Sequence, residues 1–137
     1  MEAATRIFVT NESVSGILVF LAIIAYFSYN LVRNHLSALL EFRLGELVAA
    51  AKRKLAEADT PESKDLAAKE LLSVYNQACI AYLNKQIVSA GFIRTYMKEI
   101  ERIVESEDCD DLGDFDLEEY VGILLAYRDW EKQKQKG

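Results

Sequence analysis

Apolar residues follow one another without interruption near the start of the chain and recur at helical spacing over the rest. Residues 13–32 carry no charge, and residues 17–27 are apolar on every side of a helix. A helix of about 20 residues is roughly 30 Å long, which matches the hydrocarbon core of a bilayer. We therefore expect a transmembrane helix at residues 13–32.

A cleaved signal peptide and a buried core helix are the alternatives to a membrane anchor. Signal peptides begin with a positive region, but here Glu2 and Glu12 accompany a single Arg6, and the apolar run is long and ends in FSYN without a small-residue cleavage site. A domain of this size has little surface with which to wrap such a segment. These features favour the anchor.

The flanking charges predict the orientation of the anchor. Arg6 is the one base before the apolar run, whereas Arg33, Arg43 and residues 52–54 place five bases after it. The basic flank stays in the cytoplasm. We expect residues 1–12 to form a short extracytoplasmic N-terminus and residues 33–137 to be cytoplasmic, and two cysteines agree with a reducing compartment.

The pattern after the anchor predicts an all-α domain of about four helices. A juxtamembrane helix at residues 33–58 carries one apolar stripe, which either packs on later helices or pairs with another copy of the chain: Leu36, Leu40, Leu44, Leu47, Ala51 and Leu55. Residues 59–132 then form a helical domain, and residues 133–137 a basic tail.

Capping signals place the three remaining helices. Thr60 followed by Pro61 begins a helix that runs to about Asn84, and Ser89 begins the next after a short turn. A last helix runs from Leu117 to about Lys132. The expected core faces are Leu66, Leu71, Leu72, Tyr75, Ala78, Cys79, Tyr82 and Leu83, then Phe92, Ile93, Tyr96, Met97, Ile100, Ile103 and Val104, then Leu117, Tyr120, Val121, Leu124, Leu125 and Trp130.

The charge is concentrated in one acidic segment. The net charge is −6, yet residues 105–119 hold nine acids and no base. Against the calcium-loop pattern, candidate metal ligands fall at Asp108, Asp110, Asp116 and Glu119, but Leu112 stands at a ligand position and cannot coordinate. The alternative is a helix–helix loop in which Asp116 and Glu119 form a capping box.

Two further residue sets suggest binding. Arg94, Lys98 and Arg102 step by four along one helix, and with Tyr96 and Asn84 they are candidates for binding an anionic nucleotide; the alternative is a solvated face paired with neighbouring glutamates. Small residues in the anchor allow close helix packing in lipid: Ser15, Gly16, Ala22, Ala25 and Ser28.

Catalytic and cofactor motifs are missing from the sequence. It has no phosphate-cradling glycine loop, no paired cysteines at metal spacing and a single histidine, His35, which we read as an interfacial polar residue. We expect a protein that is not an enzyme and binds no cofactor.

Residues 71–106, LLSVYNQACIAYLNKQIVSAGFIRTYMKEIERIVES, resemble a bacterial and phage family of unknown function with one N-terminal membrane helix and a helical cytoplasmic domain. Ile87-Val88-Ser89 matches the turn of that family, with Ser89 in place of its acidic cap. In layout the chain also looks like the small membrane effectors of type III CRISPR systems, which are gated by cyclic tetra-adenylate. These resemblances imply a bacterial inner membrane and a role in antiphage defence.

The leading hypothesis is a single-pass interaction or effector module in the lipid bilayer that forms a homo-oligomer or binds a cytoplasmic partner protein. A membrane effector gated by a cyclic oligoadenylate and a calcium-responsive module are the alternatives. No feature of the sequence points to long nucleic acid.

Overall fold

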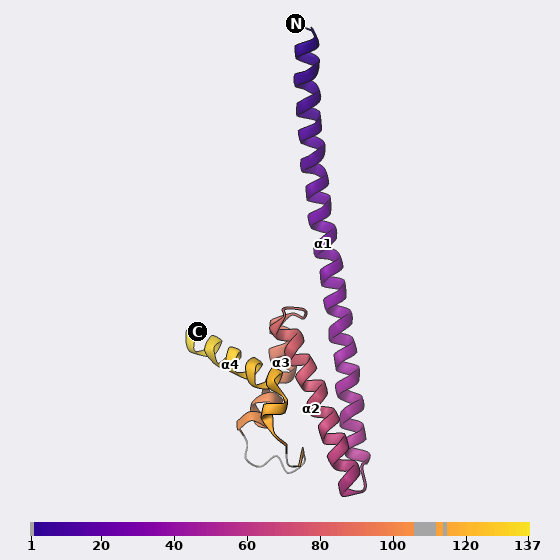
Figure 1. Cartoon of the computed structure of the whole chain (residues 1–137), viewed down its shortest axis with the longest axis vertical. Helices are drawn as coiled ribbons and strands as arrows, with labels where there is room; N and C mark the ends of the chain where they lie inside the picture. The colour runs from indigo at the N-terminus through magenta and orange to yellow at the C-terminus, as the bar shows by residue number, and fades with distance from the viewer. Residues whose placement is uncertain (1, 106–111, 114) are drawn as a thin grey trace. The chain divides into compact units, whose positions relative to one another are not determined.

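The computed structural model of the protein describes residues 2–105, 112–113 and 115–137, and these are predominantly helical (Figure 1). The expected all-α class is confirmed. The chain divides into two compact units, Met1–Leu36 and Ser37–Gly137, which we call unit 1 and unit 2. The elements are α1 (Glu2–Glu57), α2 (Pro61–Leu83), α3 (Ser89–Glu105), the 3-10 helix η2 (Leu117–Glu119) and α4 (Val121–Lys136).

Unit 1 consists of the first part of α1, and its side chains from Asn11 onward are almost all exposed. From Asn11 to Leu36 every side chain is exposed except that of Asn30, which is partly covered. The helix contains an 18-residue stretch that is long and apolar enough to cross a membrane, and none of that stretch is buried. The apolar run of the sequence therefore forms a helix that none of the described residues buries.

The second part of α1 belongs to unit 2 and packs by one stripe. Leu44, Val48 and Ala51 are buried in the core, and three leucines pack against it in part: Leu40, Leu47 and Leu55. The stripe thus packs on helices of its own chain, which was one of the two predicted alternatives. Leu36 is exposed and takes no part in this packing.

The sequence signals at the start of α2 are confirmed. The Thr60 side chain accepts a hydrogen bond from the Ser63 N–H, the Ser63 hydroxyl accepts one from the Thr60 N–H, and Pro61 is the first residue of the helix. This reciprocal capping box satisfies two N–H groups that the first turn leaves without helical partners. Lys54 Nζ lies 2.8 Å from Glu70 Oε1 across the α1–α2 corner.

The buried face of α2 is close to the predicted one. Leu72, Ala78 and Cys79 are fully covered, and the Tyr82 ring stacks on Phe92 of α3 at 4.6 Å between centroids. Leu66 was predicted in this face, but it is 68% exposed, because the first turns of α2 are buried through Ala67 and Ala68 instead.

The end of α2 has the geometry of a Schellman motif. The Gln86 N–H donates to the Ala81 carbonyl and the Lys85 N–H to the Tyr82 carbonyl. Lys85 adopts the left-handed conformation, with φ of 57°. Glycine usually occupies this position because its missing Cβ removes the steric penalty.

The cap of α3 was placed one residue too late. Ser89 is the first helical residue, while the Val88 carbonyl accepts the first helical bond from the Phe92 N–H. Val88 therefore stands in the cap position. A valine side chain cannot accept a hydrogen bond, so the cap residue gives this turn no side-chain bond. The side-chain acceptor at this turn comes from α1 instead, where Glu41 Oε1 accepts from the Val88 N–H at 3.0 Å.

The predicted last helix is divided in two. Asp116 caps η2, because its side chain accepts from the Glu118 N–H. The expected capping box with Glu119 is replaced by a backbone bond, in which the Glu119 N–H donates to the Asp116 carbonyl. Tyr120 separates η2 from α4, and α4 continues beyond the predicted end at Lys132 to Lys136. Residues 133–136, which we predicted as a tail, are therefore helical.

Helix α4 also presents a different face to the core from the one predicted. Val121 and Leu125 are 53% and 47% exposed, whereas Gly122, Ile123, Ala126 and Tyr127 are buried. The cause is the close approach of α4 to α2 at Gly122, where an added Cβ would lie 2.6 Å from Asn76 Oδ1 and 2.9 Å from the Asn76 carbonyl oxygen. Because of this contact, the small residues Gly122 and Ala126 of α4 face α2 and the core.

We expect Gly122→Ala to destabilise unit 2 by about 1–3 kcal/mol, the usual cost of overpacking a tight contact. Gly45→Ala is the matched control, because its Cβ would meet only Tyr96 Oη, at the ordinary distance of 3.9 Å. An alanine there should be neutral or stabilising by about 0.5–1 kcal/mol. The measurement is chemical denaturation of the full chain in mild detergent, followed by the fluorescence of Trp130. Equal stability of the two variants would contradict the close-approach argument.

Candidate functional site

The first candidate surface is the exposed helix of unit 1. At about 100° per residue, Ser15, Ala22, Ala25 and Ser28 fall within an arc of roughly 140°, and Gly16 lies outside it. All five predicted packing residues are exposed, and no atom comes within 4 Å of a Cβ added at Gly16. Larger side chains, among them Leu18, Leu21 and Tyr29, lie within the same arc, so the small residues alternate with bulky ones along this side of the helix.

The second candidate is a groove between α2 and α4. Its volume is about 720 Å³, and three half-exposed apolar side chains line it: Ile80, Val121 and Leu125. Glu119, Arg128, Asp129 and Lys132 also line it, and together they carry both signs of charge. We call this surface the α2–α4 groove.

Sequence reasoning missed this groove. Helical periodicity assigned Val121 and Leu125 to the core, although α4 is turned so that they face outward. The one signal was Gly122, a glycine in the first turn of a helix, which permits close helix approach. Of the predicted ligand residues, Asn84 lines the groove.

The structure does not bring the five predicted ligand residues together. Arg94 and Lys98 are exposed on α3, and Arg102 Nη2 lies 2.6 Å from Glu99 Oε1. Tyr96 lies about 200° around the helix from Arg94. Its ring contacts Tyr75 and Phe92 in the core, so it does not stand beside the basic row.

The candidate metal ligands are divided in the same way. Asp108 and Asp110 lie outside the described residues, and Asp116 is engaged as the cap of η2. Leu112, which interrupts the calcium pattern, is buried in the hydrophobic core. Within residues 2–105, 112–113 and 115–137 there is no group of three or more His, Cys, Asp or Glu placed to hold a metal ion.

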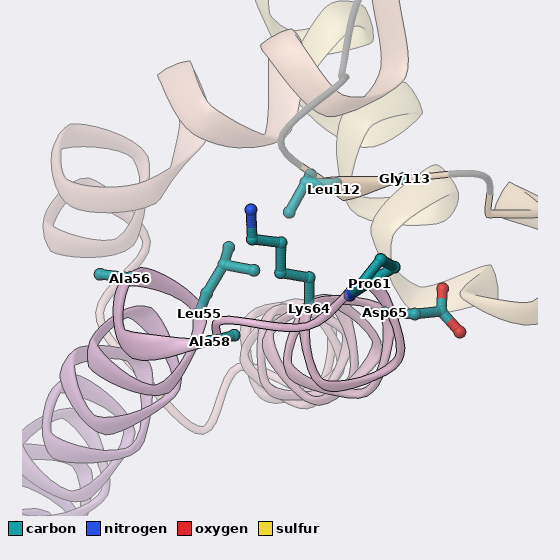
Figure 2. A pocket seen from close by; sticks show the side chains of 8 residues that line it. All are labelled: Leu55, Ala56, Ala58, Pro61, Lys64, Asp65, Leu112 and Gly113. Carbon is teal, nitrogen blue, oxygen red and sulfur yellow. The ribbon is translucent and has the colours of Figure 1, made fainter.

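A cavity of about 630 Å³ lies where α1 meets α2 (Figure 2). Leu55 and Leu112 give it apolar walls, and the Lys64 side chain extends between them, whereas Asp65 points away (Figure 2). Catalysis requires polar groups that converge on one reacting atom. Lys64 and Asp65 do not converge, so the described lining supplies no catalytic set.

The buried titratable groups hold α4 in place. The Tyr82 hydroxyl donates to Asp129 Oδ2 at 2.9 Å, and Tyr127 Oη lies within hydrogen-bond distance of Glu105 and Glu131. Burial, followed by the bond to Asp129, raises the pKa of Tyr82 to about 12. The bonds to the two glutamates raise the pKa of Tyr127 as well.

The thiol of Cys79 belongs to the same buried set. Burial in the core raises its pKa to about 12. A thiol must ionise to act as a nucleophile, so this cysteine is inert near neutral pH. These groups therefore stabilise the fold and do not carry acid–base or nucleophilic chemistry.

Comparison with protein-family models, curated proteins and solved structures finds no match to this chain. The two exposed surfaces, the helix of unit 1 and the α2–α4 groove, are the features of the molecule that bear on its function.

We expect Tyr82→Phe to lower stability below pH 10 by about 1.5–3 kcal/mol, because it removes a hydrogen bond to a charged group. This difference in stability between wild type and variant should shrink as the pH rises from 10 to about 12. Over that range the Tyr82 phenol ionises in the unfolded wild type but stays protonated in the native state, which lowers the stability of wild type alone. One proton accounts for at most about 1.4 kcal/mol per pH unit. Unfolding free energies of both proteins across this range provide the test, and a deficit that does not change with pH would contradict it.

Proposed function

We propose that the chain is a single-pass membrane protein in which unit 1 is the anchor and unit 2 is a helical interaction module. The exposed apolar stretch of α1 carries this proposal. Residues 17–27 include eight Ile, Leu, Val or Phe side chains, all of them exposed. Each contributes about 0.3–0.6 kcal/mol to membrane insertion, so together they favour it by roughly 2–5 kcal/mol.

The flanking charges support a cytoplasmic unit 2. Arg33 and Arg43 follow the apolar stretch closely, and Lys52, Arg53 and Lys54 come within the same helix. Basic residues near a membrane helix resist translocation, so this flank stays inside. We place the chain in the inner membrane of a bacterial cell, in line with the resemblance of residues 71–106.

Unit 2 is suited to association with another protein. The α2–α4 groove combines exposed apolar side chains with rim charges of both signs, which is the usual make-up of a protein interface. We propose that the groove binds a second copy of unit 2 or a cytoplasmic partner. Association of copies would bring anchors together, and the small residues Ser15, Ala22, Ala25 and Ser28 on one side of the helix would allow local close contacts between them.

Replacing Leu21 and Ile24 by arginine should prevent membrane integration, because each arginine at the centre of a membrane helix costs about 2.5–3.5 kcal/mol. Wild type should stay in the membrane pellet after extraction at alkaline pH, and the double variant should be released. Leu66→Arg with Ser73→Arg adds the same charge at exposed positions of α2 and should behave like wild type. Wild-type protein in a detergent-free, high-speed supernatant would refute the anchor.

Leu125→Arg tests the α2–α4 groove. A charge buried in an apolar contact without a partner costs several kcal/mol, so the variant should lose the association that wild type shows. Light scattering of the full chain in detergent gives the mass, and pull-down from membranes gives any partner. Leu66→Arg, exposed on α2 outside the groove lining, is the matched control. Association that survives Leu125→Arg would exclude the groove as the interface.

A further inference from the structure

Four lysines gather at one end of unit 2. Lys85 follows the last turn of α2, and Lys132, Lys134 and Lys136 occupy the last turns of α4. Two contacts bring these segments together: the Tyr82 hydroxyl lies 2.9 Å from Asp129 Oδ2, and Gln133 Nε2 lies 3.4 Å from Tyr82 Oη. We call this surface the lysine end.

Helix α4 runs in the same general direction as α2. The Ile123 N–H, in its first turn, donates to Asn76 Oδ1 at 3.3 Å, in the middle of α2, whereas Asp129 and Gln133 lie beside Tyr82 near the end of α2 (Figure 1). Three residues of α4 follow Gln133. The last lysines therefore extend past the contact with Tyr82.

The lysine end is also the end at which the chain enters unit 2. Glu41 Oε1 accepts from the Val88 N–H at 3.0 Å, which fixes the turn between α2 and α3 to α1 four residues after Ser37. Glu41 follows Val32, where the uncharged run ends, by nine positions in the sequence. A connection this short limits how far the lysine end can lie from a lipid surface, whose charge acts over a Debye length of about 8 Å.

The other side chains of this end suit an interface between water and lipid. Val88 is 59% exposed, and Lys134 Nζ lies 3.8 Å from the ring centroid of Trp130, the one tryptophan of the chain. Tryptophan favours the headgroup layer. Three acids nearby accept hydrogen bonds within the domain: Asp129 from Tyr82, Glu131 from Tyr127 and Glu41 from the Val88 N–H.

The backbone conformation at Lys85 also singles out this lysine. Its left-handed conformation would be less strained with glycine, yet a base occupies it. Lys85→Gly would relieve the strain and remove the charge together. This substitution can therefore separate the stability of the fold from the function of the lysine.

We propose that the lysine end binds the anionic phospholipid headgroups of the same membrane that holds unit 1. Contact with lipid would restrict the orientation of unit 2 and therefore of the α2–α4 groove. The inference rests on the proposed single-pass anchor, because it requires a bilayer within reach of Glu41. An acidic partner protein is the other occupant such a surface could have, and the experiment distinguishes the two.

The test uses the full chain in lipid nanodiscs, with Trp130 as the probe. Phosphatidylcholine with a nitroxide on its headgroup quenches a tryptophan that lies in the headgroup layer. We expect strong quenching when the discs also contain phosphatidylserine, and weak quenching in discs of phosphatidylcholine alone. Added salt, to about 0.5 M, should weaken the quenching because it screens the lysines.

Two variants with equal changes in charge complete the test. The first is the triple variant Lys85→Gly/Lys132→Gln/Lys136→Gln, which keeps Lys134 over the Trp130 ring. Its quenching should no longer depend on phosphatidylserine. Lys85→Gly alone should raise the melting temperature. Lys52→Gln/Arg53→Gln/Lys64→Gln, around the α1–α2 corner, should be quenched like wild type. Quenching that is the same with and without phosphatidylserine overturns the lipid contact and favours a protein partner, even where the chain is fully integrated. Failure to integrate into discs or membranes overturns the anchor and, with it, this inference.

Discussion

The structure depends on a change of apolar pattern within one helix, α1. In unit 1 the apolar residues after Asn11 surround the helix, and within the part of the chain that the structure describes they are exposed. In unit 2 they narrow to one stripe, and Leu44, Val48 and Ala51 of that stripe enter the core. A helix that is apolar all round needs an apolar solvent, while one with a single stripe needs one packed neighbour. The same element thus forms the proposed anchor in one unit and part of the packed core in the other.

The contact between Gly122 and Asn76 has a comparable effect on function. Because α4 lies so close to α2 at this point, Gly122 and Ala126 take the buried positions, and Val121 and Leu125 are left outside. The groove is a direct result of that rotation. The same packing brings Asp129 and Gln133 beside Tyr82, and these contacts place the last turns of α4 at the lysine end.

Local signals predicted the elements well and the long-range contacts poorly. Thr60 and Pro61 located the start of α2 because capping involves residues three or four apart. Val88 was missed as the cap of α3 because its N–H is satisfied by Glu41, 47 residues away. The groove was missed for the same kind of reason, since periodicity reports the spacing of apolar residues and not how close two helices come. Leu112 interrupted a metal pattern in the sequence, and its burial in the core gives that interruption a structural purpose.

The proposed anchor, the proposed lipid contact of the lysine end and the proposed interface in the groove would support one another energetically. Three half-exposed apolar side chains, Ile80, Val121 and Leu125, offer little area, and association in free solution loses translational and rotational freedom worth several kcal/mol. Anchoring in one bilayer removes part of that loss by raising the effective concentration of the partners. Contact of Lys132 and its neighbours with lipid would remove more, because it would restrict the range of orientations that the groove can adopt. A shallow groove is sufficient under these conditions, and it would be too weak for a freely diffusing domain.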